Sequence, residues 1–368
     1  MRFSTKIKLN TIYIWTSFAI LTFLVGFRWN VGIDWQAYMN LFGDNSIMLV
    51  NKETRIELGN IIIKGALVIW ANLHDGGYYL WIMGFLTMFF FFYSIKRDSV
   101  SPVLSILLFI TLGFYFDLMN GVRQYLAVSL FMFSWQFLFD KQFVRYVVVI
   151  LVAATFHSSV IMLLPIYFIC NCKFDKKVLV IIAIMAVFLS FVISSVVGEF
   201  ASMFEKYEVY GDSEHAKAGG ILSYLRILFP LILFAVIMSV YDTLINNSRR
   251  IRILTNLSLF SIFITLFFPT TALMIRLGWY FQISFIVFIP ILCRILSQRN
   301  SLLFKSFSLV YSMLYVITIY SRPVSNIIPF KLNFRLADFT LLKILIICFL
   351  CSSFFVFLLT FKRIVNKK

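Results

Sequence analysis

The stretch YYLWIMGFLTMFFFFYSI, from Tyr78 to Ile95, contains no charged residue and ends at the basic pair Lys96-Arg97. About 20 apolar residues in a helix cross the hydrocarbon core of a bilayer, so this stretch predicts a membrane-spanning helix. Similar runs recur along the 368-residue chain, which is 61% hydrophobic and contains 44 Phe. A soluble domain is about 45–50% apolar. The sequence therefore predicts an all-α integral membrane protein.

Twelve hydrophobic spans can be placed so that most of the 33 Lys and Arg residues fall on one side of the membrane. The positive-inside rule then puts both termini in the cytoplasm, with residues 1–368 as a single polytopic membrane domain and the first span as an uncleaved signal anchor. The predicted spans are residues 9–27, 78–95, 102–118, 121–139, 143–156, 159–171, 178–197, 221–241, 253–271, 274–293, 302–320 and 339–360.

The longer predicted outer loops are residues 28–77, 198–220 and 321–338. Residues 56–73 of the first loop are apolar but carry Glu57 and Lys64, and a full crossing there would invert every later loop. We expect a re-entrant or interfacial helix instead. Residues 143–171 are too long for one span and short for two. A tight helical hairpin is expected there, with His157 at its polar tip.

The composition argues against several other classes. The net charge of +17 is scattered over short loops, with no contiguous basic domain that could follow a phosphate backbone, so nucleic acid is not an expected partner. The five cysteines fall within spans or near their inner ends, which implies no disulfide framework. The chain lacks the Walker A, GxGxxG and HExxH motifs. No metal and no cofactor are expected.

Arginines on the outer side are unusual in this topology, because the positive-inside rule disfavours them there. Several of them lie beside Asp, Asn, Gln, Trp or Tyr, which suggests an anion-binding site that faces the outer leaflet. The outer arginines are Arg28, Arg123, Arg276, Arg322 and Arg335.

The first candidate group follows the first span and combines Arg28 and Asp34 with three aromatic residues, Trp29, Trp35 and Tyr38. The planar guanidinium binds phosphate through a fork of donors, and a carboxylate can orient it or accept a proton. The aromatic rings can stack on sugars through their apolar faces. An interfacial aromatic belt with an ordinary Arg–Asp pair is the alternative.

The second group surrounds Asn120-Gly121, a turn dipeptide that places Arg123 in the first turn of the next helix. A cation at a helix N-terminus is unfavourable by roughly 0.3–1 kcal/mol. A bound anion would be favoured at the same place, with Gln124 beside it. Snorkelling of Arg123 to the outer headgroups is the alternative.

Two further places hold candidates. His157 could act as a base, although a lone polar turn is more often structural, through capping by Ser. Arg276 lies just inside the outer end of its span, where an uncompensated Arg costs several kcal/mol, so a partner or ligand is expected. Trp279 and Tyr280 follow it as sugar-binding candidates.

These motifs resemble the EpsG/Wzy-type family of bacterial polysaccharide polymerases. The likeness covers nearly the whole chain in order and hydropathy. It departs at Trp35 and Phe330, where Tyr is more usual. The matching residues are Arg28, Gly32, Asp34 and Tyr38; Gly121-Val122-Arg123-Gln124 with Leu126, Ala127 and Ser129; Phe156-His157-Ser158-Ser159 with Pro165; Arg276; and Asn326 with Pro329-Phe330.

The resemblance implies a GT-C-like, metal-independent and inverting glycosyltransferase at the outer face of the bacterial inner membrane. Its substrate would be an undecaprenyl-diphosphate-linked oligosaccharide, and the growing glycan would be transferred to the non-reducing end of a new unit. Membrane lipids, a chain-length regulator and a flippase are the implied partners. Arg28, Arg123, Arg276 and Gln124 would bind the diphosphate, and Asp34 or His157 would assist the hydroxyl. A lipid-linked oligosaccharide flippase and an O-antigen ligase are the alternatives.

Overall fold

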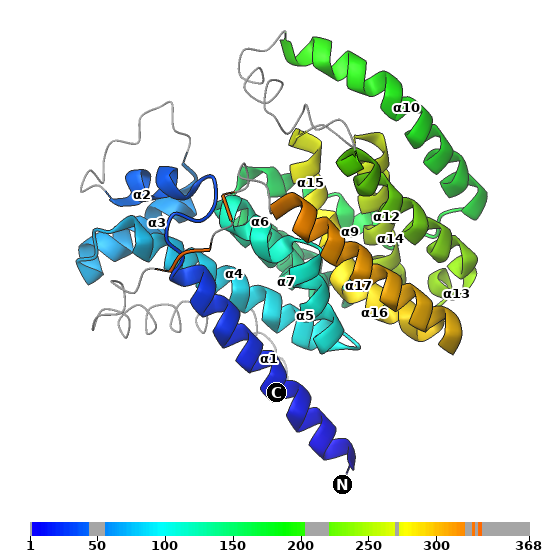
Figure 1. Cartoon of the computed structure of the whole chain (residues 1–368), viewed down its shortest axis with the longest axis horizontal. Helices are drawn as coiled ribbons and strands as arrows, with labels where there is room; N and C mark the ends of the chain where they lie inside the picture. Colours follow the sequence, from blue (N-terminus) through cyan, green and yellow to red (C-terminus); the bar gives the residue numbers. More distant parts are fainter. Residues whose placement is uncertain are drawn as a thin grey trace. The chain divides into compact units, whose positions relative to one another are not determined.

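The computed structural model describes residues 2–43, 56–202, 221–268, 272–320, 326–327 and 330–332. Within these ranges the chain is helical, which confirms the all-α class (Figure 1). The β-type pairing there is limited to one isolated antiparallel bridge, between Arg28 and Leu332. The chain divides into two compact units. The first comprises residues 1–98, 109–164 and 319–368, and the second comprises residues 99–108 and 165–318.

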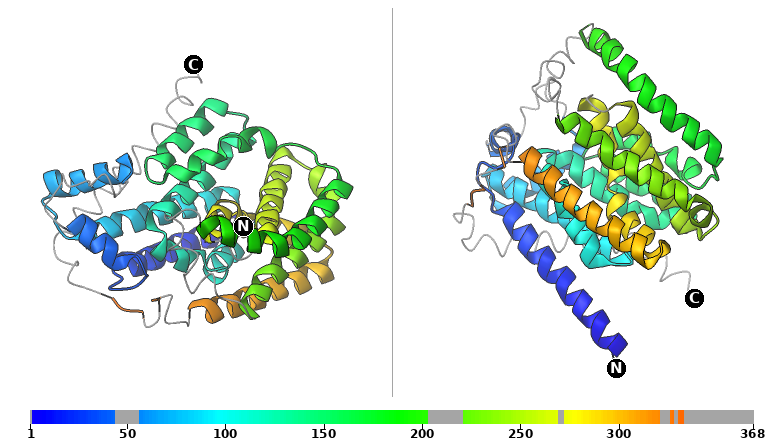
Figure 2. Two further views of the ribbon diagram at one scale, coloured as in Figure 1. Left: turned by 90° about the horizontal axis from the view of Figure 1, so that it is seen from above. Right: turned by 45° about the vertical axis from the view of Figure 1, so that its right-hand side comes forward.

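Helix α4 is the centre of the first unit. It packs against α1, α2 and α7, and α7 packs against α8 (Figure 2). The helices of this unit are α1 (Arg2–Gly26), α2 (Trp35–Gly43), α3 (Leu58–Gly65), the π-helix η1 (Ala66–Trp70), α4 (Gly76–Asp98), α6 (Phe114–Asn120), α7 (Val122–Phe139), α8 (Phe143–Ala154) and the 3-10 helix η2 (Ser158–Leu163).

Helix α14 is the centre of the second unit, where it contacts α10, α12, α13, α15 and α16. Buried polar contacts accompany this packing, such as the 2.9 Å contact between the Ser258 and Ser284 hydroxyls. The helices that lie wholly or mostly in this unit are α5 (Pro102–Thr111), α9 (Ile166–Ile169), α10 (Lys176–Ser202), α12 (Ile221–Ser239), α13 (Tyr241–Ile245), α14 (Arg249–Phe267), α15 (Ala272–Gln282), α16 (Phe285–Ile295) and α17 (Gln298–Tyr320).

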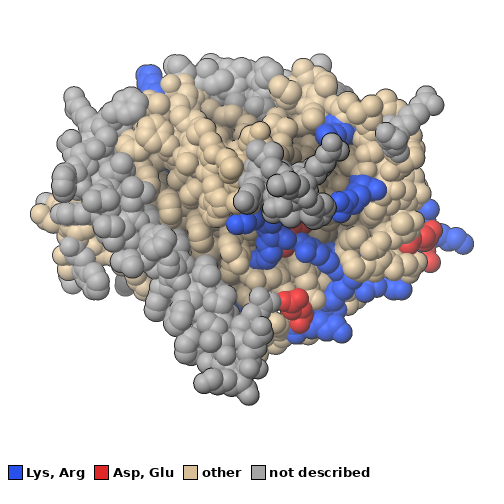
Figure 3. All heavy atoms as spheres, turned by 90° about the horizontal axis from the view of Figure 1, so that it is seen from below, with Lys and Arg blue, Asp and Glu red and all other residues tan. Residues whose placement is uncertain are grey.

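Three helical segments of the described chain are long and apolar enough to cross a membrane: Gly76–Asp98, Arg249–Phe267 and Arg276–Ile295. The bent pair α5 and α6 makes a fourth if it is counted as one span. Lys and Arg side chains gather on the face shown in Figure 3, with a few acidic ones among them. The chain is thus a membrane protein by its apolar helices. The number of twelve spans and the GT-C-like architecture stay predictions.

Two segments of the sequence, residues 56–73 and 143–171, did not fit simple membrane spans. Residues 56–73 do form a short helix, α3, which continues into the π-helical turn η1. The predicted span 159–171 is helical but interrupted, because η2 and the one-turn helix α9 replace a continuous α-helix there, and its crossing of the membrane stays a prediction. Pro165 stands between them, and proline lacks the N–H that a continuous helix would need. The predicted span 339–360 and most of loops 198–220 and 321–338 lie outside the described residues.

Glycine allows the close crossing of α1 and α4. A Cβ atom at Gly84 would lie 2.6 Å from Cγ1 of Val25, which is fully buried. The side chain of Val25 is β-branched and stiff, so it cannot swing away. The backbone of α4 therefore packs directly against the Val25 side chain at this point.

We expect Gly84→Ala to destabilise the first unit by about 1–3 kcal/mol, because the added methyl group overpacks this crossing. The measurement is the apparent melting temperature of the detergent-solubilised protein, which should fall by several degrees. Gly65→Ala is the matched control, since a Cβ at Gly65 meets nothing within 4 Å. Equal melting temperatures for the two variants would contradict the proposed crossing.

Candidate functional site

The chain leaves α1 through a loop that is fixed by a distant segment. The backbone of Arg28 bridges to Leu332, and the Gly32 N–H donates to the Asn326 carbonyl at 2.8 Å. Gly32 has a φ of +98°, and a Cβ there would lie 2.7 Å from the Met119 carbonyl oxygen. Both the left-handed backbone and the lack of space require glycine here.

Arg28 itself points inward. The residue is only 4% exposed. Its guanidinium donates to the carbonyls of Val25 at 3.1 Å and Met119 at 3.4 Å. The Nε atom is buried and has no hydrogen-bond partner among the described residues. Burial lowers the pKa of Arg28 to about 10, so the group is still charged at neutral pH. Within the described residues, no carboxylate lies within ion-pair distance of this buried cation.

Helix α2 carries the other candidates of this first group. The backbone carbonyl of Asp34 accepts the Tyr38 N–H at 3.0 Å, which starts the helix. Trp35 and Tyr38 are buried, at 5% and 7% exposure. The Tyr38 ring stacks on Tyr79 with ring centres 6.0 Å apart. Burial raises the pKa of Tyr38, and the nearby Arg123 opposes that shift. Arg123 Nε donates to the Tyr38 hydroxyl at 3.4 Å.

A carboxylate joins the second and third candidate groups. Glu57 Oε2 accepts from an Arg123 guanidinium nitrogen at 2.7 Å, and Glu57 Oε1 lies 3.7 Å from His157 Nδ1. The Arg123 and Glu57 side chains are 29% and 17% exposed, so solvent only partly screens this ion pair. The 3.7 Å separation is too long for a hydrogen bond, but a small movement would make one. Arg123, Glu57 and His157 thus form one cluster.

Asn60 holds this cluster to the chain around it. Its amide nitrogen donates to Glu57 Oε2 at 3.2 Å and to the Phe156 carbonyl at 3.1 Å. Its amide oxygen accepts from the Tyr79 hydroxyl at 2.8 Å. Asn60 is fully buried. These bonds hold the Glu57 carboxylate in place, because its rotation would break the hydrogen bond from the buried Asn60 amide.

The turn that carries His157 lies directly against α3. The Gly59 N–H donates to the Thr155 carbonyl at 2.7 Å, and a Cβ at Gly59 would lie 2.6 Å from Thr155 Oγ1. Glycine therefore allows the backbones to meet, and this brings Glu57 to His157. His157 precedes η2 in an extended conformation, with φ of −154°.

The predicted position of Arg123 is confirmed, since α7 begins at Val122 directly after the turn at Gly121. The anion that this helix end favours is supplied by the chain itself, in Glu57. Gln124 is buried on the same helix. The roles of Arg123 and Gln124 in diphosphate binding stay predictions.

The remaining candidates belong elsewhere. Arg276, Trp279 and Tyr280 lie on α15 in the second unit, where Arg276 is exposed, Trp279 is half-buried and Tyr280 is fully buried. Arg322 and Arg335 lie outside the described residues. The site that the structure assembles therefore draws on the first unit.

Sequence reasoning missed Glu57 and Asn60 as site residues. Glu57 was visible only as a charge within an apolar run, and its partner Arg123 is 66 positions away. The position of Arg123 at a helix N-terminus predicts a nearby anion, and a search for that anion among the acidic residues could have identified Glu57. Trp29 belongs to the first predicted group and, unlike the buried Trp35, is 41% exposed.

A double-mutant cycle tests the ion pair. Glu57→Ala should destabilise the protein, because it leaves the half-buried Arg123 cation without its counter-charge, whereas adding Arg123→Ala should restore part of the loss. We expect a coupling of about 1–3 kcal/mol from apparent melting temperatures. Strictly additive effects would show that the two charges do not stabilise each other.

A family model described as the EpsG family matches residues 11–332. Neither the curated proteins nor the solved structures gave a match to the chain.

Proposed function

The chain belongs to the EpsG family, and on that premise we propose that it polymerises undecaprenyl-diphosphate-linked oligosaccharide repeat units. Membership itself indicates a polysaccharide polymerase of the glycosyltransferase type. The finer proposal adds the lipid carrier and the outer face of the bacterial inner membrane, with both termini in the cytoplasm. The growing glycan would be transferred to the non-reducing end of a new lipid-linked unit.

One observation carries this proposal: a guanidinium, a carboxylate and an imidazole from three separate segments converge in the cluster of Arg123, Glu57 and His157. Glycosyl transfer from a diphosphate needs a proton acceptor for the attacking hydroxyl and positive charge for the leaving group. The cluster offers the acceptor, and Arg28 offers a buried positive charge close to the same tyrosine, Tyr38.

The reaction balances with these groups alone. The acceptor hydroxyl oxygen forms a bond to the anomeric carbon of the growing glycan, while the bond from that carbon to the diphosphate oxygen breaks. The hydroxyl proton passes to the base. The lipid diphosphate leaves with the electron pair, and guanidinium groups stabilise its charge. A single displacement of this kind inverts the anomeric centre, and it requires no metal in the proposed scheme.

We assign the base to His157 in preference to Asp34. Glu57 faces His157 Nδ1 and would orient the ring, so that Nε2 is left to take the hydroxyl proton. Contacts of this kind often tighten only when substrate is bound. Asp34 stands at the start of α2, where its backbone carbonyl already serves the helix. Glu57 is then a positioning residue.

The arginines have different proposed roles. Arg28 has no counter-ion among the described residues, so an anionic ligand would relieve the unfavourable burial of its charge. We therefore place the diphosphate against Arg28 first. Arg123 is already neutralised by Glu57, and its part is to hold the carboxylate and the Tyr38 hydroxyl in place. Arg276 stays a proposed third contact.

Purified protein in lipid nanodiscs, given a lipid-linked repeat unit, should produce a ladder of polymer lengths. We expect Arg28→Ala to slow its formation by about a hundredfold or more, the usual effect of losing an electrostatic stabiliser. Arg123→Ala should slow it too, because Glu57 and the Tyr38 hydroxyl lose the group that holds them in place. Arg145→Ala is the control, because the Arg145 guanidinium donates to the nearby Gln142 side chain at 2.7 Å, on the same stretch of chain and outside the cluster. A normal ladder from the first two variants would reject the site, and no ladder from any protein would favour transport.

His157→Gln and Asp34→Asn distinguish the two candidate bases. Loss of a general base typically lowers the rate by about 10²–10⁴-fold, so we expect that loss in kcat for His157→Gln, with KM little changed. Asp34→Asn should retain most of the activity. The reverse order of the two variants, at equal protein levels, would move the base to Asp34.

A further inference from the structure

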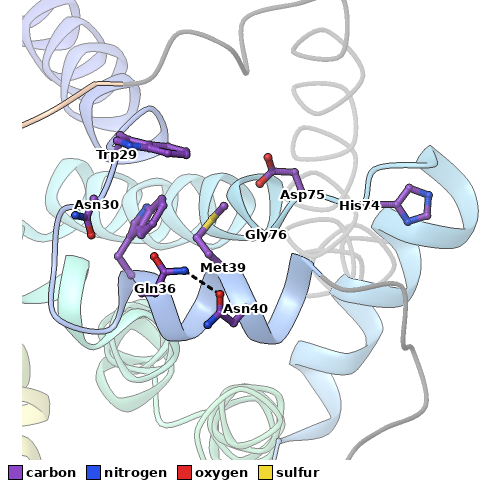
Figure 4. A pocket seen from close by; sticks show the side chains of 9 residues that line it. Trp29, Asn30, Gln36, Met39, Asn40, His74, Asp75 and Gly76 are labelled. Carbon is purple, nitrogen blue, oxygen red and sulfur yellow. Dashed lines mark hydrogen bonds between the residues drawn. The ribbon is translucent and has the colours of Figure 1, made fainter.

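A broad hollow lies beside the loop that follows α1. It has a volume of about 870 Å³, within the range of ligand sites. Its lining comes from the loop, from α2 and from the start of α4 (Figure 4). The lining residues are Trp29, Asn30, Trp35, Gln36, Met39, Asn40, His74, Asp75 and Gly76.

The lining has the chemistry of a sugar site. Trp29 presents an indole with 41% exposure, and the buried Trp35 braces it edge to face at 4.8 Å between ring centres. The amides of Gln36 and Asn40 lie side by side on one helix face, joined by a 2.8 Å hydrogen bond. Sugar hydroxyls both donate and accept, and amides offer both functions. An aromatic face suits the apolar side of a pyranose ring.

The same lining does not suit a phosphate. None of the nine described residues that form it is Lys or Arg, and Asp75 adds a negative charge. In Figure 4 the Asp75 carboxylate turns toward Trp29, whereas His74 lies at the other end of the hollow. Asp75 Oδ1 accepts the Gly77 N–H at 2.7 Å, which fixes the direction of the carboxylate. A neutral polyol therefore fits better than a lipid headgroup with a phosphate.

The walls of the hollow are rigid. The backbone N–H of Trp29 donates to the Lys331 carbonyl at 2.9 Å, which ties the loop to that segment. On the opposite wall, a Cβ at Gly76 would lie 2.8 Å from both the Cα and the carbonyl oxygen of Met39. Backbone thus meets backbone where α2 crosses the start of α4. A preformed wall keeps the entropy lost on ligand binding low.

A narrow crevice of about 10 Å³ adjoins the hollow and leads toward Arg28, so it must widen before a diphosphate can contact the buried guanidinium. It shares Trp29, Trp35, Met39 and Asp75 with the hollow, and Arg28 also lines it. In a lipid-linked glycan, the sugars lie directly beside the diphosphate. A surface suited to sugars is likewise followed by a buried cation, in the same order as the sugars and the diphosphate are linked in the substrate.

We propose that this hollow, bounded by Trp29, Gln36, Asn40 and Asp75, is a subsite for the sugar rings next to the diphosphate. The proposal rests on the proposed function, because that function supplies the lipid-linked glycan. It adds a site that binds sugar without help from the diphosphate. Trp29 stacks on a ring, and the paired amides and the carboxylate bond to its hydroxyls.

Binding of free saccharide tests the subsite. The probe is a set of fragments, one and two repeat units long, cut from the polysaccharide that the source strain secretes and freed of lipid and phosphate. Saturation-transfer NMR should show binding to the wild-type protein in nanodiscs. We expect Trp29→Ala to weaken binding at least tenfold, and Gln36→Ala combined with Asn40→Ala to do the same. Alanine favours the helix, so α2 should stay folded.

Trp15→Ala is the matched control, because Trp15 on α1 is exposed to a similar degree, 38%. That variant should bind the fragments normally, and inorganic diphosphate should not displace them from the wild-type protein. Fragments that do not bind the wild-type protein, or that bind the Trp29 and amide variants equally well, would overturn the subsite. Displacement by diphosphate would also overturn it.

The two proposals can fail separately. Bound fragments without any ladder from lipid-linked units would leave the sugar subsite in place and reject polymerisation. A ladder with unaltered fragment binding in the Trp29 and amide variants would keep the polymerase and reject the subsite.

Discussion

The ion pair between Glu57 and Arg123 is the interaction on which the arrangement of the first unit depends. A charge taken out of water costs several kcal/mol unless a counter-charge lies close and the remaining lone pairs are bonded. Asn60 completes that bonding and, through the Phe156 carbonyl, ties α3 to the turn that carries His157. One carboxylate therefore links the N-terminus of α7, the short helix α3 and the His157 imidazole.

The two best-placed arginines are in different electrostatic states. Arg123 is compensated by Glu57, so it adds little net attraction for a second anion. Arg28 is surrounded by carbonyl dipoles, which stabilise a cation less than a carboxylate does. A bound diphosphate would therefore gain most from Arg28. The same comparison explains why an outer arginine can be retained for two reasons, of which only one is ligand binding.

The sequence predicted those features that depend on neighbouring residues. The apolar run at 78–95 gave α4, and Asn120-Gly121 placed Arg123 at a helix start. Contacts between distant segments could not be predicted this way: a glutamate in an apolar run looks the same whether it faces headgroups or an arginine 66 positions away. Hydropathy also missed the break at Pro165. Whether Trp29 or Trp35 is exposed depends on the loop's attachment to residues 326–332.

A diphosphate is the same group whatever glycan it carries, so Arg28 cannot distinguish one repeat unit from another. Discrimination must come from contacts with the sugar hydroxyls. A site built to bond a hydroxyl rejects an analogue that lacks it far more strongly than an apolar site rejects a change in size, because its own polar groups are left unpaired. The amides of Gln36 and Asn40 and the carboxylate of Asp75 are such groups. In the proposed function, charge near Arg28 would give affinity and reactivity, and the lining beside Trp29, which contains no Lys or Arg, would give specificity.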